Sequence, residues 1–222
     1  ATVVIAPLSS VTTVSAQSDD YTPPDNSLFA TKYVADEVIV IAPNMSVSNT
    51  YSVSANPSTV EVDESEGVFY VGYESGAVEK REISDGSLVE SVSATGWQSD
   101  IEVDSQTGDL YTLGGESVEK IDGDSMEIIA TYDKIGSYQS GGIKLYDDRM
   151  IVGDVYTESS GVGAHILAKD GLTLIKNTSI GSGSVGIGPN GRFYLQETYS
   201  NAKIYELDSD GTVVNSASTG SY

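Results

Sequence analysis

Residues 59–96 alternate between apolar and polar positions, and turn-forming residues interrupt the alternation at regular points. Four short segments follow this pattern between clusters of Gly, Ser, Asp and Glu, and they read VEVD, VFYVGY, AVEKREI and LVESVSA. A period of two residues is typical of strands with one buried face, and the clusters are typical of turns. The stretch is therefore predicted to form one four-stranded antiparallel meander.

The same meander recurs along the chain at a spacing of about 40 residues. An apolar position in its first strand recurs at intervals of 41, 42 and 42 residues, as Val62, Val103, Leu145 and Ile187. A position in its second strand recurs at intervals of 41, 40 and 43 residues, as Tyr70, Tyr111, Ile151 and Tyr194. The predicted repeats span about 18–57, 58–97, 98–138, 139–182 and 183–222, and the first has a degraded first strand around Tyr21.

Five four-stranded repeats of this length predict an all-β fold, a five-bladed β-propeller. One twisted sheet cannot bury both of its faces alone, whereas sheets stacked around an axis cover one another. We assign residues 18–222 to the propeller domain and residues 1–17 to an N-terminal strand segment. A β-sandwich is the structural alternative, but it would not require the constant repeat spacing.

Residues 1–16 are apolar and uncharged, and three interpretations of them remain open. Their ending, Val14-Ser15-Ala16, fits the small-residue end of a secretory signal. Val4-Ile5-Ala6-Pro7 matches Val40-Ile41-Ala42-Pro43, which suggests the outer strands of another repeat. Such a segment could also add to the sheet edge of a neighbouring subunit. We expect an ordered strand that pairs within the chain or with a neighbour, and no membrane span, because the segment is short and contains proline.

The chain carries 33 acidic and 11 basic residues, which gives a formal net charge of −22. This charge repels nucleic acids and anionic lipids, so neither is an expected partner. Two interpretations of the charge remain, a surface kept soluble by self-repulsion and a protein adapted to high salt in a halophilic host. The chain has no cysteine, which excludes disulfides, thiol catalysis and cysteine-based metal sites.

Several short motifs recur within the repeats. In the second repeat they are Val62-Asp63, Gly67-Val68-Phe69-Tyr70-Val71, Ala77-Val78-Glu79-Lys80, Asp85-Gly86-Ser87-Leu88-Val89 and Thr95-Gly96. In these motifs the chain resembles the YVTN-type propeller units of archaeal surface-layer proteins and their NHL- and PQQ-like relatives. The resemblance covers most of residues 58–222. It implies an extracellular or envelope propeller that mediates contacts, and it transfers no catalytic residue.

Aromatic residues recur in two sets of loops that open on the same face of a propeller. Trp97, Tyr138 and Tyr222 follow the glycine that ends a repeat, whereas Tyr33, Tyr73 and Tyr199 lie near the end of a second strand. Flat rings with a polar fringe suit stacking on a sugar or contact with a protein, and ordinary packing between blades is the alternative. We predict a ligand-binding surface formed by Trp97, Tyr138, Tyr73, Tyr199 and Tyr33.

The innermost strands place Glu61, Glu102, Lys144 and Gly186 at equivalent positions around the predicted central channel. Paired carboxylates perform acid–base chemistry in glycosidases, so a secreted polysaccharide hydrolase or lyase is the alternative function. Solvated or mutually paired channel residues are the simpler interpretation, and we expect the protein not to be an enzyme. No cofactor or metal is expected, because His165 is the only histidine and Gly181-Ser182-Gly183-Ser184 lacks the lysine of a phosphate loop.

Two sequons, Asn44-Met45-Ser46 and Asn177-Thr178-Ser179, predict glycosylation of Asn44 and Asn177 in a secreted protein. Together these features favour an extracellular structural and adhesive subunit of a cell or virion surface, repeated in a filament, sheath or envelope layer. The expected partners are other copies of the chain, contacted through the N-terminal strand, and a cell-surface glycan or protein.

Overall fold

The computed structural model describes residues 21–133, 135–136, 141–154, 163–197 and 203–219, which form five β-sheets. Blade 1 contains β1 (Leu28–Lys32), β2 (Glu37–Ile41) and β3 (Val47–Ser52), with a short 3₁₀ helix, η1 (Tyr33–Ala35), after β1. Blade 2 contains β4 (Pro57–Asp63), β5 (Val68–Tyr73), β6 (Ala77–Glu82) and β7 (Leu88–Ser93). Blade 3 contains β8 (Gln98–Val103), β9 (Leu110–Gly114), β10 (Ser117–Ile121) and β11 (Ile128–Tyr132).

Blade 4 contains β12 (Ile143–Tyr146), β13 (Arg149–Val152), β14 (His165–Ala168) and β15 (Thr173–Asn177). Blade 5 contains β16 (Ser182–Ile187), β17 (Phe193–Glu197), β18 (Lys203–Leu207) and β19 (Val213–Ser218). Strands that follow one another in the sequence pair antiparallel, so each blade is a meander. The prediction of an all-β fold with five blades is confirmed, and four blades have the expected four strands.

Blade 1 differs from the prediction, because its described residues form three strands. Tyr21, where a degraded first strand was predicted, lies outside any strand. Its backbone N–H donates to the Ser84 carbonyl oxygen at 3.1 Å, and its hydroxyl is 2.8 Å from Ser48 Oγ. These contacts hold Tyr21 against β3 of blade 1 and against the turn between β6 and β7 of blade 2. The predicted N-terminal strand segment, residues 1–17, lies outside the described residues.

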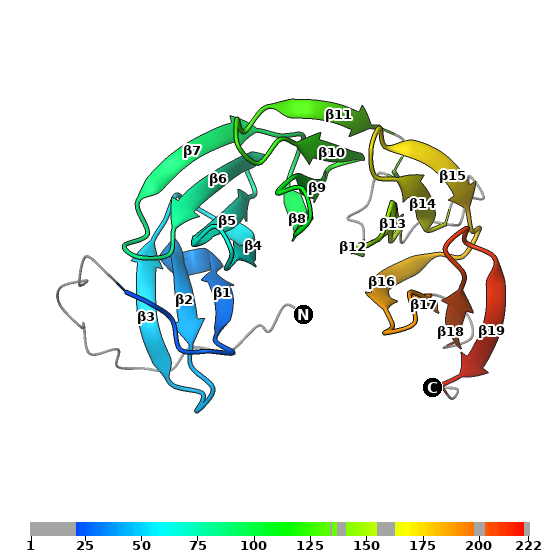
Figure 1. Ribbon diagram of the computed structural model, residues 1–222, viewed down its shortest axis with the longest axis horizontal. Helices are drawn as coiled ribbons and strands as arrows, with labels where there is room; N and C mark the ends of the chain where they lie inside the picture. Colours follow the sequence, from blue (N-terminus) through cyan, green and yellow to red (C-terminus); the bar gives the residue numbers. More distant parts are fainter. Residues whose placement is uncertain (1–20, 134, 137–140, 155–162, 198–202, 220–222) are drawn as a thin grey trace.

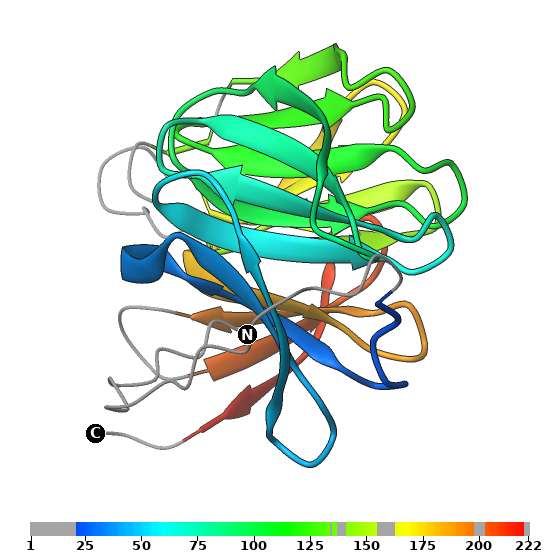
Figure 2. The same ribbon diagram turned by 90° about the vertical axis from the view of Figure 1, so that its left-hand side faces the viewer.

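The blades fan around a common axis and form an open arc, with blade 1 at one end and blade 5 at the other (Figures 1 and 2). One hydrophobic core joins each blade to the next, and the described residues form four such cores. In β5, Phe69 belongs to the core shared with blade 1, whereas Tyr70 belongs to the core shared with blade 3. Every residue of β5 is buried, because this middle strand has a blade on each side.

Polar contacts between blades lie close to these cores. Thr95 donates to Glu119 in the next blade through its N–H and its hydroxyl, and the Ser54 hydroxyl donates to Glu79 in the next blade. Glu79 and Glu119 hold equivalent places on the third strands of their blades, opposite Val71 and Thr112 respectively. The two carboxylates therefore bind the connection that arrives from the preceding blade, which fixes blades 2 and 3 relative to the blades before them.

Candidate functional site

Two of the predicted aromatic residues form an exposed stacked pair. The ring centroids of Tyr33 and Trp97 are 6.4 Å apart, with an angle of 23° between the ring planes. Tyr33 belongs to η1 in blade 1, whereas Trp97 lies in the connection from blade 2 to blade 3. Each of the two residues is 40% exposed. The pair is thus a flat apolar surface built from segments that are far apart in the sequence.

Local backbone conformation positions both rings. The 3₁₀ helix that carries Tyr33 ends at Ala35 and is capped by Asp36, which has a left-handed φ of 54°. Trp97 follows Gly96, whose φ is +65°. A Cβ atom on Gly96 would lie 2.8 Å from the Cα atom of Gly115, so only glycine fits the close approach of these two loops. This packing fixes the backbone next to Trp97.

A carboxylate completes the polar side of this surface. The Tyr33 hydroxyl donates a hydrogen bond to Glu74, and this bond raises the pKa of Tyr33, with smaller contributions from burial and from the Glu74 charge. Val34 beside it is 93% exposed. We call Tyr33, Val34, Glu74 and Trp97 the aromatic platform. It offers ring faces for stacking, an apolar side chain and a hydrogen-bond acceptor.

The other predicted aromatic residues are placed differently. Tyr73 is fully buried, and its hydroxyl donates to Glu79 inside the blade 1 and blade 2 interface. Burial is the main reason that the pKa of Tyr73 is raised. Its ring is part of the core and offers no face to a ligand. Tyr138, Tyr199 and Tyr222 lie outside the described residues.

The predicted axial residues lie on neighbouring inner strands, and two of them are in contact. Lys144 on β12 forms an ion pair with Glu102 on β8. Burial raises the pKa of Glu61 to about 7, while Lys144 lowers it and Asp100 adds to the rise. Gly186 on β16 brings no side chain to this place. The axial group is therefore a partly paired cluster with one carboxyl group that titrates near neutral pH.

Asp100 belongs to the axial group, although the repeat alignment did not single it out. Its Oδ2 atom accepts a hydrogen bond from the Ile143 backbone N–H at 2.8 Å, which joins blade 3 to blade 4. Burial is the largest influence on Asp100 and raises its pKa against this bond and the nearby Lys144 charge. The sequence held one signal for it, an acidic residue two positions before Glu102 on the same strand face.

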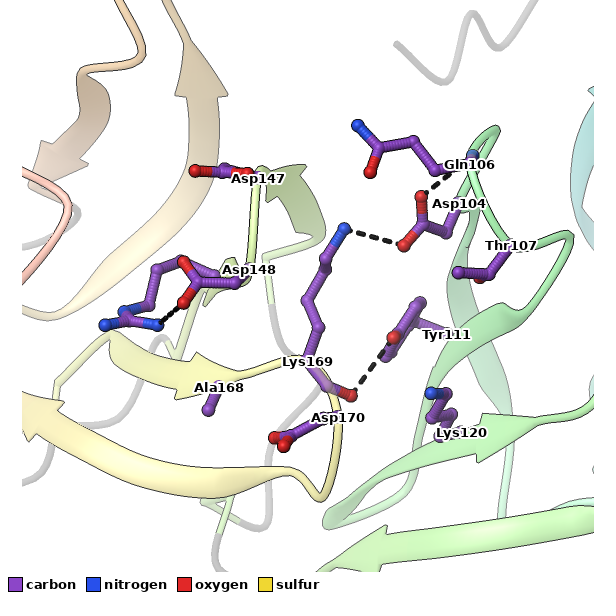
Figure 3. Close-up of a pocket in the computed structure, with 11 residues that line it drawn as sticks. Asp104, Gln106, Thr107, Tyr111, Lys120, Asp147, Asp148, Ala168, Lys169 and Asp170 are labelled. Carbon is purple, nitrogen blue, oxygen red and sulfur yellow. Dashed lines mark hydrogen bonds and ion pairs between the residues drawn. The ribbon is translucent and has the colours of Figure 1, made fainter.

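A charged cleft of about 400 Å³ lies between blades 3 and 4, and sequence analysis missed it (Figure 3). Lys169 reaches across the cleft to Asp104, with 2.6 Å between Nζ and Oδ2. The Tyr111 hydroxyl donates to the Lys169 carbonyl oxygen at 3.0 Å. Arg149 is paired with Asp148 at the edge. The cations of the cleft are thus occupied by neighbouring carboxylates, and the contacts join the two blades.

Both predicted glycosylation residues lie in or next to turns. Asn44 is exposed between β2 and β3, and its Oδ1 atom accepts from the N–H and the hydroxyl of Ser46. Asn177 is partly buried at the end of β15, where its Oδ1 atom accepts from the N–H groups of Gly163 and Ser179. The Asn44 side chain is the more accessible of the two.

Two motifs with closely spaced carboxylates, Asp122-Gly123-Asp124 and Asp208-Ser209-Asp210-Gly211, form turns that Asp122 and Asp208 stabilise. Each Oδ1 atom accepts hydrogen bonds from backbone N–H groups two to four residues further along the chain. Among the described residues, no three His, Cys, Asp or Glu side chains are grouped so that they could bind a metal ion. The part of the chain that the structure describes contains no helix with the length and hydrophobicity of a membrane span.

No family model matches this sequence, and no curated protein sequence matches it. Solved structures match its fold. Hydrazine synthase from Kuenenia stuttgartiensis has a TM-score of 0.69 at 15% identity, over 94% of this chain and 68% of that one. A chain of the mitotic checkpoint complex has a TM-score of 0.71 at 10% identity, over 84% of this chain and 62% of that one. The computationally designed Ika8 protein gives 0.68 at 9% identity, over 88% and 59%.

These likenesses concern the fold alone, because the identities are low. Together with the five antiparallel meanders, they define the class of the protein as a five-bladed β-propeller. The chain spans 59% to 68% of the length of the three matched chains.

Proposed function

We propose that this propeller is a structural and adhesive subunit that acts through contacts with other molecules. The observation that carries the proposal is the stacked Tyr33–Trp97 pair, which is exposed on a scaffold whose blades are joined by hydrophobic cores. An aromatic pair that is already ordered loses little conformational entropy when a partner binds. Such residues are also enriched among those that dominate binding energy.

The partner chemistry that fits the aromatic platform best is a pyranose ring of a cell-surface glycan. The apolar face of the sugar would stack on Trp97, and sugar hydroxyl groups would donate to Glu74. An apolar side chain of a partner protein is the alternative occupant.

Intrinsic fluorescence can test this proposal, because Trp97 is the only tryptophan. Titration with mono- and oligosaccharides is expected to shift its emission, and calorimetry is expected to show weaker binding to Tyr33→Ala and none to Trp97→Ala. Tyr146→Ala is the matched control, since Tyr146 is 42% exposed and lies outside the platform. Unchanged binding of the Trp97→Ala variant would place the glycan site elsewhere.

Subunits of the proposed assembly associate through the N-terminal segment, residues 1–17. The support is the match between Val4-Ile5-Ala6-Pro7 and Val40-Ile41-Ala42-Pro43, part of which forms β2 in blade 1. A second copy of a strand sequence can add to a free sheet edge of a neighbour. Deletion of residues 1–16 is expected to abolish assembly and to leave the circular dichroism spectrum and Tm of the propeller unchanged.

The proposed setting is the outside of a cell or virion, in a filament, sheath or envelope layer, with an archaeal and salt-loving host. The net charge of −22 supports the high-salt part, and the resemblance to YVTN-type repeats supports the surface part. Mass spectrometry of the native protein tests it directly, because a secreted protein is expected to carry a glycan on Asn44 and Asn177. Unmodified asparagine at both positions would argue against the glycoprotein.

The second candidate is a polysaccharide hydrolase or lyase, and Glu61 is the specific observation that favours it. Its pKa of about 7 suits a general acid, and it lines a cleft of about 620 Å³ between blades 1 and 2. Glu102 is the second carboxylate, although Lys144 neutralises it. A glycan turnover assay decides between the two functions: Glu61→Gln and Glu102→Gln would each lose turnover only in an enzyme.

A further inference from the structure

The two ends of the arc carry blade faces that no other described blade covers. The four hydrophobic cores join blades 1 to 2, 2 to 3, 3 to 4 and 4 to 5, and the described residues form no core between blade 5 and blade 1. In Figure 1 the two end blades are separated across the opening of the arc. Each end blade therefore has one face packed against a neighbour and one face turned to the opening.

The open face of blade 1 carries four apolar residues and one ion pair. Phe29, Val38 and Val40 belong to the core with blade 2, so the alternate residues of β1 and β2 lie on the other face. These residues are Leu28 paired with Ile41, Ala30 paired with Ile39, and Lys32 paired with Glu37, which also form an ion pair. We call this set the front face of blade 1.

Leu28 shows that the front face is built like a blade interface. Leu28 is 60% exposed, whereas the residues at its position in the other four blades are all fully buried against the preceding blade: Phe69, Leu110, Met150 and Phe193. The repeat thus places a large apolar side chain at this position in every blade. Only in blade 1 do the described residues leave it exposed to this extent.

The open face of blade 5 combines apolar and polar residues. Phe193, Leu195 and Leu207 belong to the core with blade 4. The alternate residues of β17 and β18 form what we call the back face of blade 5, in which Tyr194 pairs with Glu206 and Gln196 pairs with Ile204.

Equivalent positions in the inner blades are buried. The counterparts of Tyr194 are Tyr70 and Tyr111, each 1% exposed, and those of Ile204 are Val78 and Val118, both fully buried. Ile204 itself is 39% exposed. The back face of blade 5 therefore keeps two apolar interface residues. It also carries Gln196, and Glu206 stands where blades 2 and 3 have Lys80 and Lys120.

We propose that the front face of blade 1 in one copy packs against the back face of blade 5 in a second copy. A second copy is the occupant because front and back faces pack on each other four times among the described residues, and these residues leave one face of each kind without a blade against it. The contact is head-to-tail, so it produces a closed ring of copies or an open filament. The proposal rests on the assembly function proposed above and gives it an interface that is the alternative to the N-terminal joint.

Two charge substitutions test the interface in the full-length chain. Leu28→Asp disables the front face, and Ile204→Asp disables the back face. In sedimentation velocity at high salt, the wild-type chain is expected to form oligomers, and each variant alone is expected to be monomeric. An equimolar mixture of the two variants retains one intact interface per pair, so it is expected to form dimers and nothing larger.

Leu88→Asp is the matched control, because Leu88 is 51% exposed on the outermost strand of blade 2. It is expected to assemble as the wild type does. Circular dichroism verifies that all three variants fold. A monomeric wild type, variants that assemble normally, or a mixture that stays monomeric would each overturn the proposal.

The chain without residues 1–16 separates the two proposed joints. If this truncated chain assembles and Leu28→Asp does not, the contact between end blades is correct and the N-terminal joint is wrong. If the truncated chain is monomeric and both charge variants assemble, the N-terminal joint holds and the contact between end blades is overturned.

Discussion

Thr95 and Glu119 make a two-pronged contact between blades 2 and 3. The backbone N–H of Thr95 donates to one carboxylate oxygen at 2.9 Å, and its hydroxyl donates to the other at 2.7 Å. Glu119 is only 5% exposed. A buried carboxylate is tolerable when hydrogen bonds satisfy it, so this contact sets where blade 3 sits relative to the incoming chain.

Replacement of Glu119 by alanine is expected to lower the free energy of unfolding by about 2–3 kcal/mol, because the Thr95 N–H loses its acceptor. Glu119→Gln keeps one acceptor oxygen, so its free energy of unfolding is expected to fall by less. Urea titration measures both, with Glu90→Ala at an exposed site of blade 2 as the control. Equal stability of Glu119→Ala and the control would show that the contact adds nothing.

Glu61 is expected to make stability depend on pH in a recognisable direction. Its folded pKa of about 7 lies above the ordinary value of 4.5, so the folded protein holds this proton more tightly than the unfolded chain does. The stabilisation that Glu61 gives through this tighter proton binding is fully present below pH 4.5, and it is lost as the pH rises to about 7. Glu61→Gln should therefore be more stable than the wild type at pH 8, by about 1–3 kcal/mol.

The difference between wild type and Glu61→Gln should disappear near pH 4, where both side chains are neutral. Thermal unfolding at pH 4, 6 and 8 checks this trend. A variant that is less stable than the wild type at pH 8 would show that the Glu61 carboxylate is stabilised in the fold.

Gly96 is expected to be intolerant of alanine for two separate reasons. Its φ of +65° is unfavourable for any side chain, and an added Cβ would lie 2.8 Å from the Gly115 Cα atom. The Gly96→Ala substitution should lower the free energy of unfolding by about 2–3 kcal/mol and shift the fluorescence of the adjacent Trp97.

Gly108→Ala is the matched control, since Gly108 has a φ of +78° and open space around it. Its free energy of unfolding should fall by only about 1 kcal/mol, because this variant has the unfavourable positive φ without the steric clash. Denaturant unfolding of the two variants separates conformational strain from the steric clash. Similar losses would mean that the loop at Gly115 moves aside freely.

Salt is expected to stabilise the fold and the assembly together. A net charge of −22 repels itself within a subunit and between subunits, and the screening length falls from about 10 Å at 0.1 M salt to about 3 Å at 1 M. Tm and oligomer mass should both rise with KCl over this range. A Tm that falls with added KCl would contradict this expectation.

The repeat spacing predicted the fold because the residues of each strand and turn show by themselves which face is buried and where the chain reverses. Alternation in β5 and Gly-containing turns are visible in a few residues, and their recurrence at about 40 residues gives the blade count. The same local patterns did not distinguish buried from exposed aromatic side chains. Tyr73 and Trp97 looked equivalent as candidate ligand-binding residues, yet Tyr73 is core and Trp97 is exposed.

Contacts between segments that are far apart in the sequence could not be predicted from the sequence either. Asp104 and Lys169 are 65 residues apart, and nothing in either local pattern selects the other as a partner. The stacking of Tyr33 on Trp97 depends likewise on how two blades are rotated against each other. These relationships arise only when the sheets are arranged around the axis.

The sequence by itself determined the strands, the turns and the number of blades, since period-two alternation and glycine positions are properties of neighbouring residues. Tertiary structure alone decided which strand faces are covered and which are left at the ends of the arc. Leu28 and Phe193 hold the same place in the repeat, but one is exposed and the other is buried. The physical reason is that burial depends on what stands opposite a face, and for Leu28 no described blade does.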